Sequence, residues 1–236
     1  MSSHDAFTAL LKKESGALFS SPIAYVLIAV FLGIVGYTFV SFLFVTKQVT
    51  LLHVIYQSAL LLVLLTPLNT MRLLAEERRS GTLELLLTSP IKEVHIVIAK
   101  FLGGFSVAGA MVVLTLIYPL SLSFLADVGW EPVIGGYVGL LALAAALTAL
   151  GLAISGCTES HVVAATASTG IFLLLWMSNG LSQLLPDPWD TLFANLSPLT
   201  HLMPLATGSL YLSDIAYFGT VTILGLLGAY LSLARR

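Results

Sequence analysis

The chain has 236 residues, of which 58% are hydrophobic and 9% are charged, and its mean hydropathy is +0.99. Because about a quarter of the residues are charged in ordinary soluble domains, this composition excludes that class and indicates a polytopic all-α membrane protein. The net charge of −2 says little about partners, but no basic surface for nucleic acid is evident, so we expect no nucleic-acid partner. The single cysteine, Cys157, excludes an intrachain disulfide and a multi-cysteine metal site.

The first apolar pattern, at residues 4–20, is too polar to cross a bilayer. One helical face carries its apolar side chains, Phe7, Leu10, Leu11 and Leu18. Such a pattern predicts an interfacial helix that lies on the membrane. Ser21 then suits an N-cap with Pro22 at the first helical position, which starts a first span at about 22–45.

The second span is expected at about 51–71 and has a proline, Pro67, near its end. Proline removes one hydrogen bond of the helix and clashes with the preceding turn, so we expect a kink there.

The polar stretch 72–90 follows. It holds five charged residues within nine positions, namely Glu76, Glu77, Arg78, Arg79 and Glu84. This much charge must lie in water, and Ser80-Gly81-Thr82 breaks the helical pattern. We therefore expect a helical hairpin in which Gly81 takes a backbone conformation that strains other residues. The alternative is an ordinary solvated loop.

The third helix is expected from Ile91 to about Leu125, with its span at 96–125. This length exceeds the roughly 20 residues that a crossing needs. We therefore expect its first turns, which carry Lys92, Glu93 and Lys100, to protrude into water.

The fourth span, at about 133–156, is rich in glycine and alanine. Two pairs of small residues recur four positions apart, namely Gly135 with Gly139 and Ala142 with Ala146. This spacing predicts close packing between helices. A polar turn that contains Glu159 then leads to a fifth span at about 162–181.

Prolines interrupt the apolar segment 182–213, and the pieces between them are too short to cross. We expect a re-entrant or interfacial segment, which is tolerated only where protein or water covers the interrupted backbone. The sixth span is expected at about 214–234.

The positive charges are unevenly divided between the two sides of these six spans. If the N-terminus faces the cytoplasm, nine of the ten basic residues lie inside and only Lys47 lies outside. The inside residues are Lys12, Lys13, Arg72, Arg78, Arg79, Lys92, Lys100, Arg235 and Arg236. The positive-inside rule therefore predicts cytoplasmic termini, a cytoplasmic hairpin and an outer re-entrant segment.

Several functions are disfavoured by what the sequence lacks. No charged residue falls near the middle of an expected span, where ion-driven carriers commonly place one. A phosphate-binding loop is also missing, so ATP hydrolysis would need a separate subunit.

Ser155, Ser160 and His161 suggest an intramembrane serine protease, but a helix cap is the commoner role for serines at a turn. We expect His53 and His201 to be isolated structural residues.

The segment from Leu64 to Ile91, LLTPLNTMRLLAEERRSGTLELLLTSPI, resembles the link between the second and third spans in permeases of type-2 ABC exporters. The nearest branch contains the gliding-motility and nitrous-oxide-reductase accessory permeases. The family motif E-E-[RK]-x-x-G-T-[LI]-E is matched by Glu76, Glu77, Arg78, Gly81, Thr82, Leu83 and Glu84. The family's interfacial helix, six spans, hairpin, smaller contact between spans four and five, and broken outer helices match the whole chain in order.

The resemblance implies one transmembrane domain over 1–236, in a bacterial inner membrane, that forms a translocation path as a dimer with a second copy or a related permease. It implies a separate cytoplasmic ABC ATPase that carries ATP and Mg, no cofactor in this chain, and membrane lipid around it. The implied ATPase-coupling residues are Glu76, Glu77, Arg78, Arg79, Gly81, Thr82, Glu84 and Glu159. A scaffold that transports nothing is the alternative.

The substrate is not indicated by the sequence. Relatives often carry basic residues in the outer segment where this chain has Thr207 and Ser213. A lipid, a peptide, an ion and a periplasmic maturation factor all remain open.

Overall fold

The computed structural model describes residues 12, 16, 21–46, 50–82, 92–124 and 128–234. Within them the chain is helical, and six segments are long and apolar enough to cross a bilayer. These segments are Pro22–Thr46, Leu52–Ser80, Glu93–Ser123, Trp130–Gly156, His161–Ser182 and Leu212–Ala234. The expected all-α fold with six spans is confirmed. The expected interfacial helix lies outside the described residues, apart from Lys12 and Gly16.

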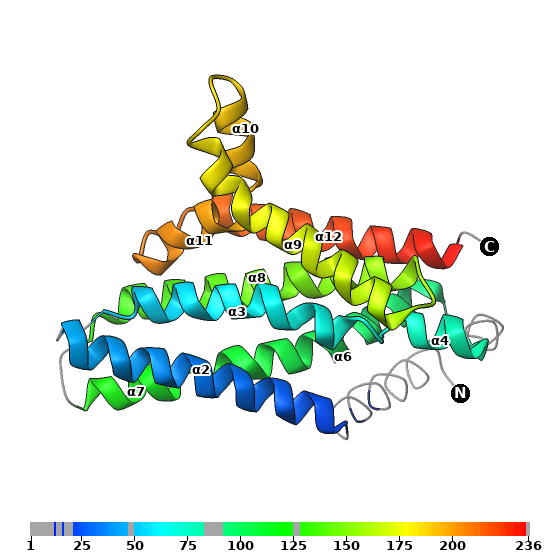
Figure 1. Ribbon diagram of the computed structural model, residues 1–236, viewed down its shortest axis with the longest axis horizontal. Coiled ribbons are helices and arrows are strands. Elements are labelled where there is room, and N and C mark those ends of the chain that lie inside the picture. Colours follow the sequence, from blue (N-terminus) through cyan, green and yellow to red (C-terminus); the bar gives the residue numbers. More distant parts are fainter. Residues whose placement is uncertain are drawn as a thin grey trace.

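The long helices alternate in direction along one bundle (Figure 1). The helices are α2 (Pro22–Thr46), α3 (Leu52–Thr70), α4 (Ala75–Ser80), α6 (Glu93–Leu114), α7 (Ile117–Ser123), α8 (Trp130–Gly156), α9 (His161–Ser182), α10 (Trp189–Leu196), α11 (Pro198–Ala206) and α12 (Leu212–Ala234). One end of the bundle holds α4 and the last turns of α12, and the other holds α7 and α11 (Figure 1). We call them the α4 end and the α11 end.

Helix α8 is the centre of the bundle and packs against α3, α6, α9, α11 and α12. Its small residues permit this packing, because neighbouring backbones come into direct contact. A Cβ on Gly225 of α12 would lie 2.6 Å from the carbonyl carbon of Ala149, and one on Gly135 would collide with the backbone of Leu205 in α11. Gly139 lies against the side chain of the same leucine. The close helix packing expected for this span is confirmed.

The third span was expected to be one continuous helix, but it consists of two. Helix α6 ends at Leu114, and α7 begins at Ile117. Pro119 explains the interruption: it has no N–H to offer the carbonyl of Thr115, and its ring crowds that carbonyl. The Thr115 carbonyl accepts a hydrogen bond from Tyr118 N instead, at 3.0 Å, and the Thr115 hydroxyl donates to Val112 O at 2.6 Å. The expectation of a continuous helix was wrong because it overlooked this proline.

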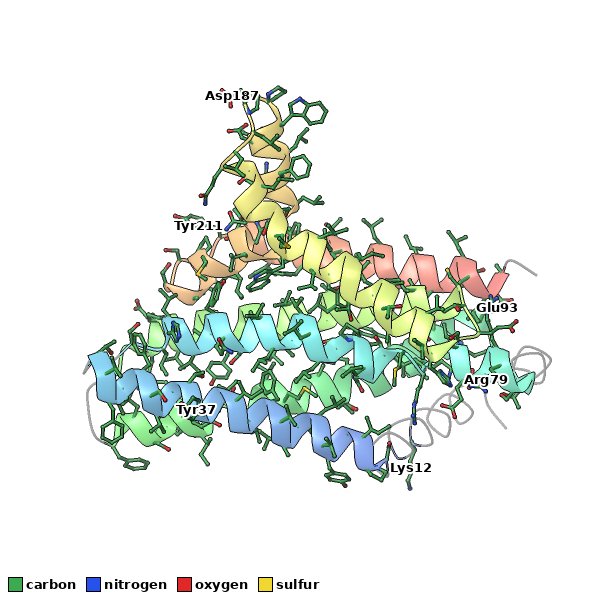
Figure 2. All side chains as sticks on the ribbon, viewed as in Figure 1. Lys12, Tyr37, Arg79, Glu93, Asp187 and Tyr211 are labelled. Atoms are coloured by element: carbon green, nitrogen blue, oxygen red, sulfur yellow. The ribbon has the colours of Figure 1, made fainter. Side chains whose placement is uncertain are left out.

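The segment between α9 and α12 contains two helices too short to cross a bilayer, α10 with eight residues and α11 with nine. Ser197 caps α11, since its side chain accepts a hydrogen bond from Leu199 N at 3.2 Å. The end of α9 and α10 lean away from the bundle, with Asp187 at the tip (Figure 2), whereas α11 packs on α8. Helix α10 buries none of its residues.

We predict that Gly225→Ala lowers the free energy of unfolding by about 1–3 kcal/mol, because the added methyl group overpacks the α8–α12 contact. Gly219→Ala, in the same helix, is the matched control, since a Cβ there would have no neighbour within 4 Å. Helix propensity makes that control neutral or stabilising by up to about 1 kcal/mol. Thermal denaturation in detergent measures both, and equal stability of the two variants would contradict the packing account.

Candidate functional site

Helix α3 ends at Thr70, and the four residues 71–74 form a turn before α4 begins. The hydroxyl of Ser155, from α8, fills this interruption. Its oxygen accepts hydrogen bonds from Leu74 N at 3.1 Å and Ala75 N at 3.0 Å, and its proton is donated to Met71 O at 3.2 Å. A side chain inserted into a helix in this way is a known cause of a helix break. The break therefore lies beyond Pro67, which stays within α3.

Helix α4 carries the charged residues of the expected hairpin, and it divides them between two faces. Glu76 and Arg79 are exposed, whereas Glu77 and Arg78 are partly buried. Figure 2 shows Arg79 at the α4 end. Gly81 ends the helix with a φ of 68°, so the strained conformation expected for this glycine is found.

The inward-facing charges of α4 bind other helices. Glu77 Oε1 lies 2.8 Å from Lys100 Nζ of α6, and Arg78 Nη2 donates to Ser232 O of α12 at 2.5 Å. With Ser155, these contacts hold α4 against α8, α6 and α12. Sequence reasoning missed these connections, because a helical pattern does not show which distant residue meets each charge.

Lys100 was expected to protrude into water, and this was wrong, since only 2% of its surface is exposed. The Glu77 carboxylate provides the opposite charge that an ammonium group needs when it is removed from water. The signal for this pairing was the run of four consecutive charged residues from Glu76 to Arg79, because consecutive positions of a helix point to all sides and not to one exposed face.

The remaining predicted coupling residues lie near α4 or outside the described part. Thr82 is exposed, and its hydroxyl lies 2.8 Å from the Ser80 hydroxyl. Glu159 is exposed in the turn between α8 and α9, and α4 contacts α9. Helix α4 and this turn therefore lie at the same end of the bundle. Glu84 lies outside the described residues.

The serines considered for catalysis bind backbone groups instead. Ser155 has the three contacts given above, and Ser160 caps α9 by accepting a hydrogen bond from Val163 N at 3.5 Å. In the described part of the chain neither hydroxyl is paired with His161, so the nucleophile–base contact that such a protease requires is not formed. The capping role expected at this turn is the one found for Ser160.

At the α11 end, His201 was expected to be isolated, but it joins three elements. Its Nδ1 lies 2.8 Å from Asp214 Oδ1 of α12, and its Nε2 lies 3.1 Å from Asn195 O of α10. Its ring also stacks on Tyr217, with centroids 4.1 Å apart. The role is structural, since these contacts connect α10, α11 and α12. His53 is likewise stacked, on Phe42, with centroids 4.8 Å apart.

The tip of the α9–α10 segment carries two neighbouring carboxyl groups, Asp187 and Asp190. The hydrogen bond that protonated Asp187 donates to the Asp190 carboxylate, together with the negative charge of Asp190, raises the pKa of Asp187. This effect is local, because Asp187 is fully exposed to solvent.

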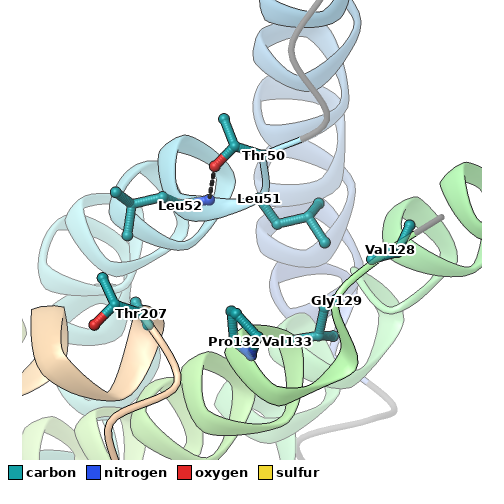
Figure 3. A pocket seen from close by; sticks show the side chains of 9 residues that line it. Thr50, Leu51, Leu52, Val128, Gly129, Pro132, Val133 and Thr207 are labelled. Carbon is teal, nitrogen blue, oxygen red and sulfur yellow. Dashed lines mark hydrogen bonds between the residues drawn. The ribbon is translucent and has the colours of Figure 1, made fainter. Parts of the chain in front are cut away.

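A cavity of 270 Å³ opens at the α11 end between α3, α8 and α11 (Figure 3). It is lined by Thr50, Leu51, Leu52, Val128, Gly129, Pro132, Val133, Ala206 and Thr207. The lining is apolar apart from two threonines and backbone groups, and it offers no charged side chain for recognition. Clustered charges of both signs lie instead at the α4 end, on helix α4.

A protein-family model described as an ABC-2 family transporter protein matches residues 53–234. The match runs from α3 to α12 and includes α4, the Glu159 turn and the outer helices. A comparison with curated proteins found no match. The resemblance to ABC-2 permeases is thus confirmed, while the narrower branch stays a prediction. Since the match covers well over half of the chain and the described residues hold six helices long and apolar enough to cross a membrane, the protein belongs to the ABC-2 transporter family and is a permease component of an ABC transporter.

Proposed function

We propose that the chain is the membrane subunit of an ATP-driven exporter and that a separate cytoplasmic ABC ATPase, which carries ATP and Mg, drives it through α4. The observation that carries the proposal is the division of charge on α4. Glu77 and Arg78 fix the helix to the bundle, and Glu76 and Arg79 remain exposed. A partner that binds the exposed face would thereby act on α6, α8 and α12 together.

The exposed face of α4 suits a protein partner. Charge-assisted hydrogen bonds contribute roughly 1.5–3 kcal/mol each, so a few such bonds to Glu76, Arg79 and the nearby Glu159 would support a specific complex. Gly81 and Thr82 turn the chain at the end of this face. Glu84 is included on the motif alone. The gliding-motility and nitrous-oxide-reductase accessory permeases are the branch that we propose for this chain.

We further propose that the α4 end lies in the cytoplasm of a bacterial inner membrane. The support is the distribution of Lys and Arg, which favours the cytoplasmic side strongly. With six spans both termini then lie in the cytoplasm, and the tip at Asp187 lies toward the outside.

A second copy of the chain, or a related permease, is proposed to complete the translocation path. In their most apolar stretches α2, α9 and α12 bury only 17%, 28% and 22% of their residues, against 67% in the second span. An apolar groove of 910 Å³ also runs between α9 and α10. Lipid covers part of such a surface, but the α9–α10 segment, which leans away from the bundle (Figure 1), suits contact with another subunit.

The topology is tested by single cysteines introduced at Ser80, Glu159 and Asp187 in a Cys157→Ser background. We expect an impermeant thiol reagent to label the first two only from the cytoplasm and the third only from outside, because the positive-inside rule orients the bundle. Labelling of the Asp187 position from the cytoplasm would overturn this topology.

Coupling is tested with the charge-swapped variant Glu76→Lys with Arg79→Glu, beside Glu131→Lys at the α11 end as a control. We first expect an ABC ATPase to co-purify with the unaltered chain. The swap should then weaken the binding of the ATPase by about tenfold or more, since each exchanged side chain would face a like charge on the ATPase in place of an opposite one. Thermal stability should stay within about 0.5 kcal/mol, because both residues are exposed. Unaltered ATPase binding and hydrolysis in the swapped variant, or no co-purifying ATPase, would refute the proposal.

The oligomeric state is tested by light scattering on the purified complex, with the detergent contribution subtracted. We expect each particle to contain two permease chains, each of 25.1 kDa if both are this protein. Particles that hold one permease chain even when the ATPase is bound would contradict the dimer.

A further inference from the structure

We infer that Ser155 is a positioning residue that makes α4 move as one body with α8, so that movement imposed on α4 reaches the helix α11 at the far end of the bundle. This inference rests on the proposed coupling function and adds a specific route to it.

The hydrogen bonds of Ser155 are complete. A serine hydroxyl has one proton to donate and two lone pairs to accept with, and here Leu74 N and Ala75 N use both lone pairs while Met71 O receives the proton. Ser155 is 0% exposed, so water cannot replace it. Its removal would leave two N–H groups and one carbonyl buried without this partner.

The hydroxyl also separates α4 from α3. In an uninterrupted helix Ala75 N would bind Met71 O directly, four residues earlier, whereas Ser155 lies between these two groups. Leu74, at the N-cap position of α4, has no side chain that could cap the helix. The start of α4 is therefore held by α8, and α3 cannot transmit force to α4 along a continuous helix.

Helix α8 continues without interruption from Ser155 to the other end of the bundle. Gly135 lies 20 residues before Ser155, which corresponds to about 30 Å of helix. Gly135 and Gly139 pack directly against Leu202 and Leu205 of α11. One stiff helix thus contacts α4 through a hydroxyl group and α11 through glycines, with no flexible segment between the two contacts.

The test uses the complex with its ATPase and a cysteine at Ser209, an exposed position just beyond α11, in the Cys157→Ser background. The rate of labelling by an impermeant maleimide is compared without nucleotide and with ATP plus vanadate. In the parent, which is the Cys157→Ser chain with the cysteine at position 209, we expect nucleotide to change the labelling rate several-fold. In the same chain with Ser155→Ala we expect this change to be lost while the ATPase stays bound. Ser168→Ala is the matched control, because Ser168 is also 0% exposed and its hydroxyl has no hydrogen-bond partner among the described residues.

A nucleotide-dependent change that persists in Ser155→Ala, or that is missing in the parent with the ATPase bound, would overturn the inference and leave the proposed function standing. Failure of any ATPase to bind the parent would instead refute the proposed function.

Hydrogen exchange on the unaltered complex covers the case in which Ser155→Ala does not fold. The amides of Leu74 and Ala75 should exchange slowly in both nucleotide states, and fast exchange in either state would contradict a permanent link between α4 and α8.

Discussion

Wherever packed helices or a bilayer exclude water, a backbone N–H or C=O that leaves its helical partner needs another one, and side-chain hydroxyls provide it at interruptions of the described helices. Ser155 satisfies the turn between α3 and α4 from another helix. The Thr115 hydroxyl binds a carbonyl at the break before α7, and Ser197 caps α11. Hydroxyl side chains thus permit the helices of this apolar protein to break where its architecture requires it.

The break between α3 and α4 has a consequence for the charges that follow it. Because α4 is no longer an extension of α3, it can lie against α6 and α12, where Glu77 meets Lys100 and Arg78 meets the carbonyl of Ser232. A buried ion pair adds little net stability, but loss of one partner is costly. These contacts therefore act chiefly to fix where α4 lies, and they leave Glu76 and Arg79 on a face that a soluble subunit can bind.

Small residues have the corresponding role along the rest of the bundle. Helices in lipid associate through close packing, because the surrounding chains are as apolar as their own side chains. Gly135 and Gly225 let α11 and α12 approach the backbone of α8. Gly33 of α2 and Gly170 and Gly180 of α9 have no neighbour within 4 Å of an added Cβ, so the close glycine contacts are concentrated around α8.

The sequence alone determined the membrane class, the six spans and their order, because a bilayer imposes a minimum length and an apolar composition on every crossing helix. It also indicated the positive φ of Gly81 and the close packing at Gly135, since both depend on local residue type. Only the tertiary structure decided which charges are buried. Lys100 was expected in water and His201 alone, but Glu77 and Asp214 lie beside them because distant segments pack together. The role of Ser155 likewise depends on residues about 80 positions away, and no periodic pattern in a single chain records such a contact.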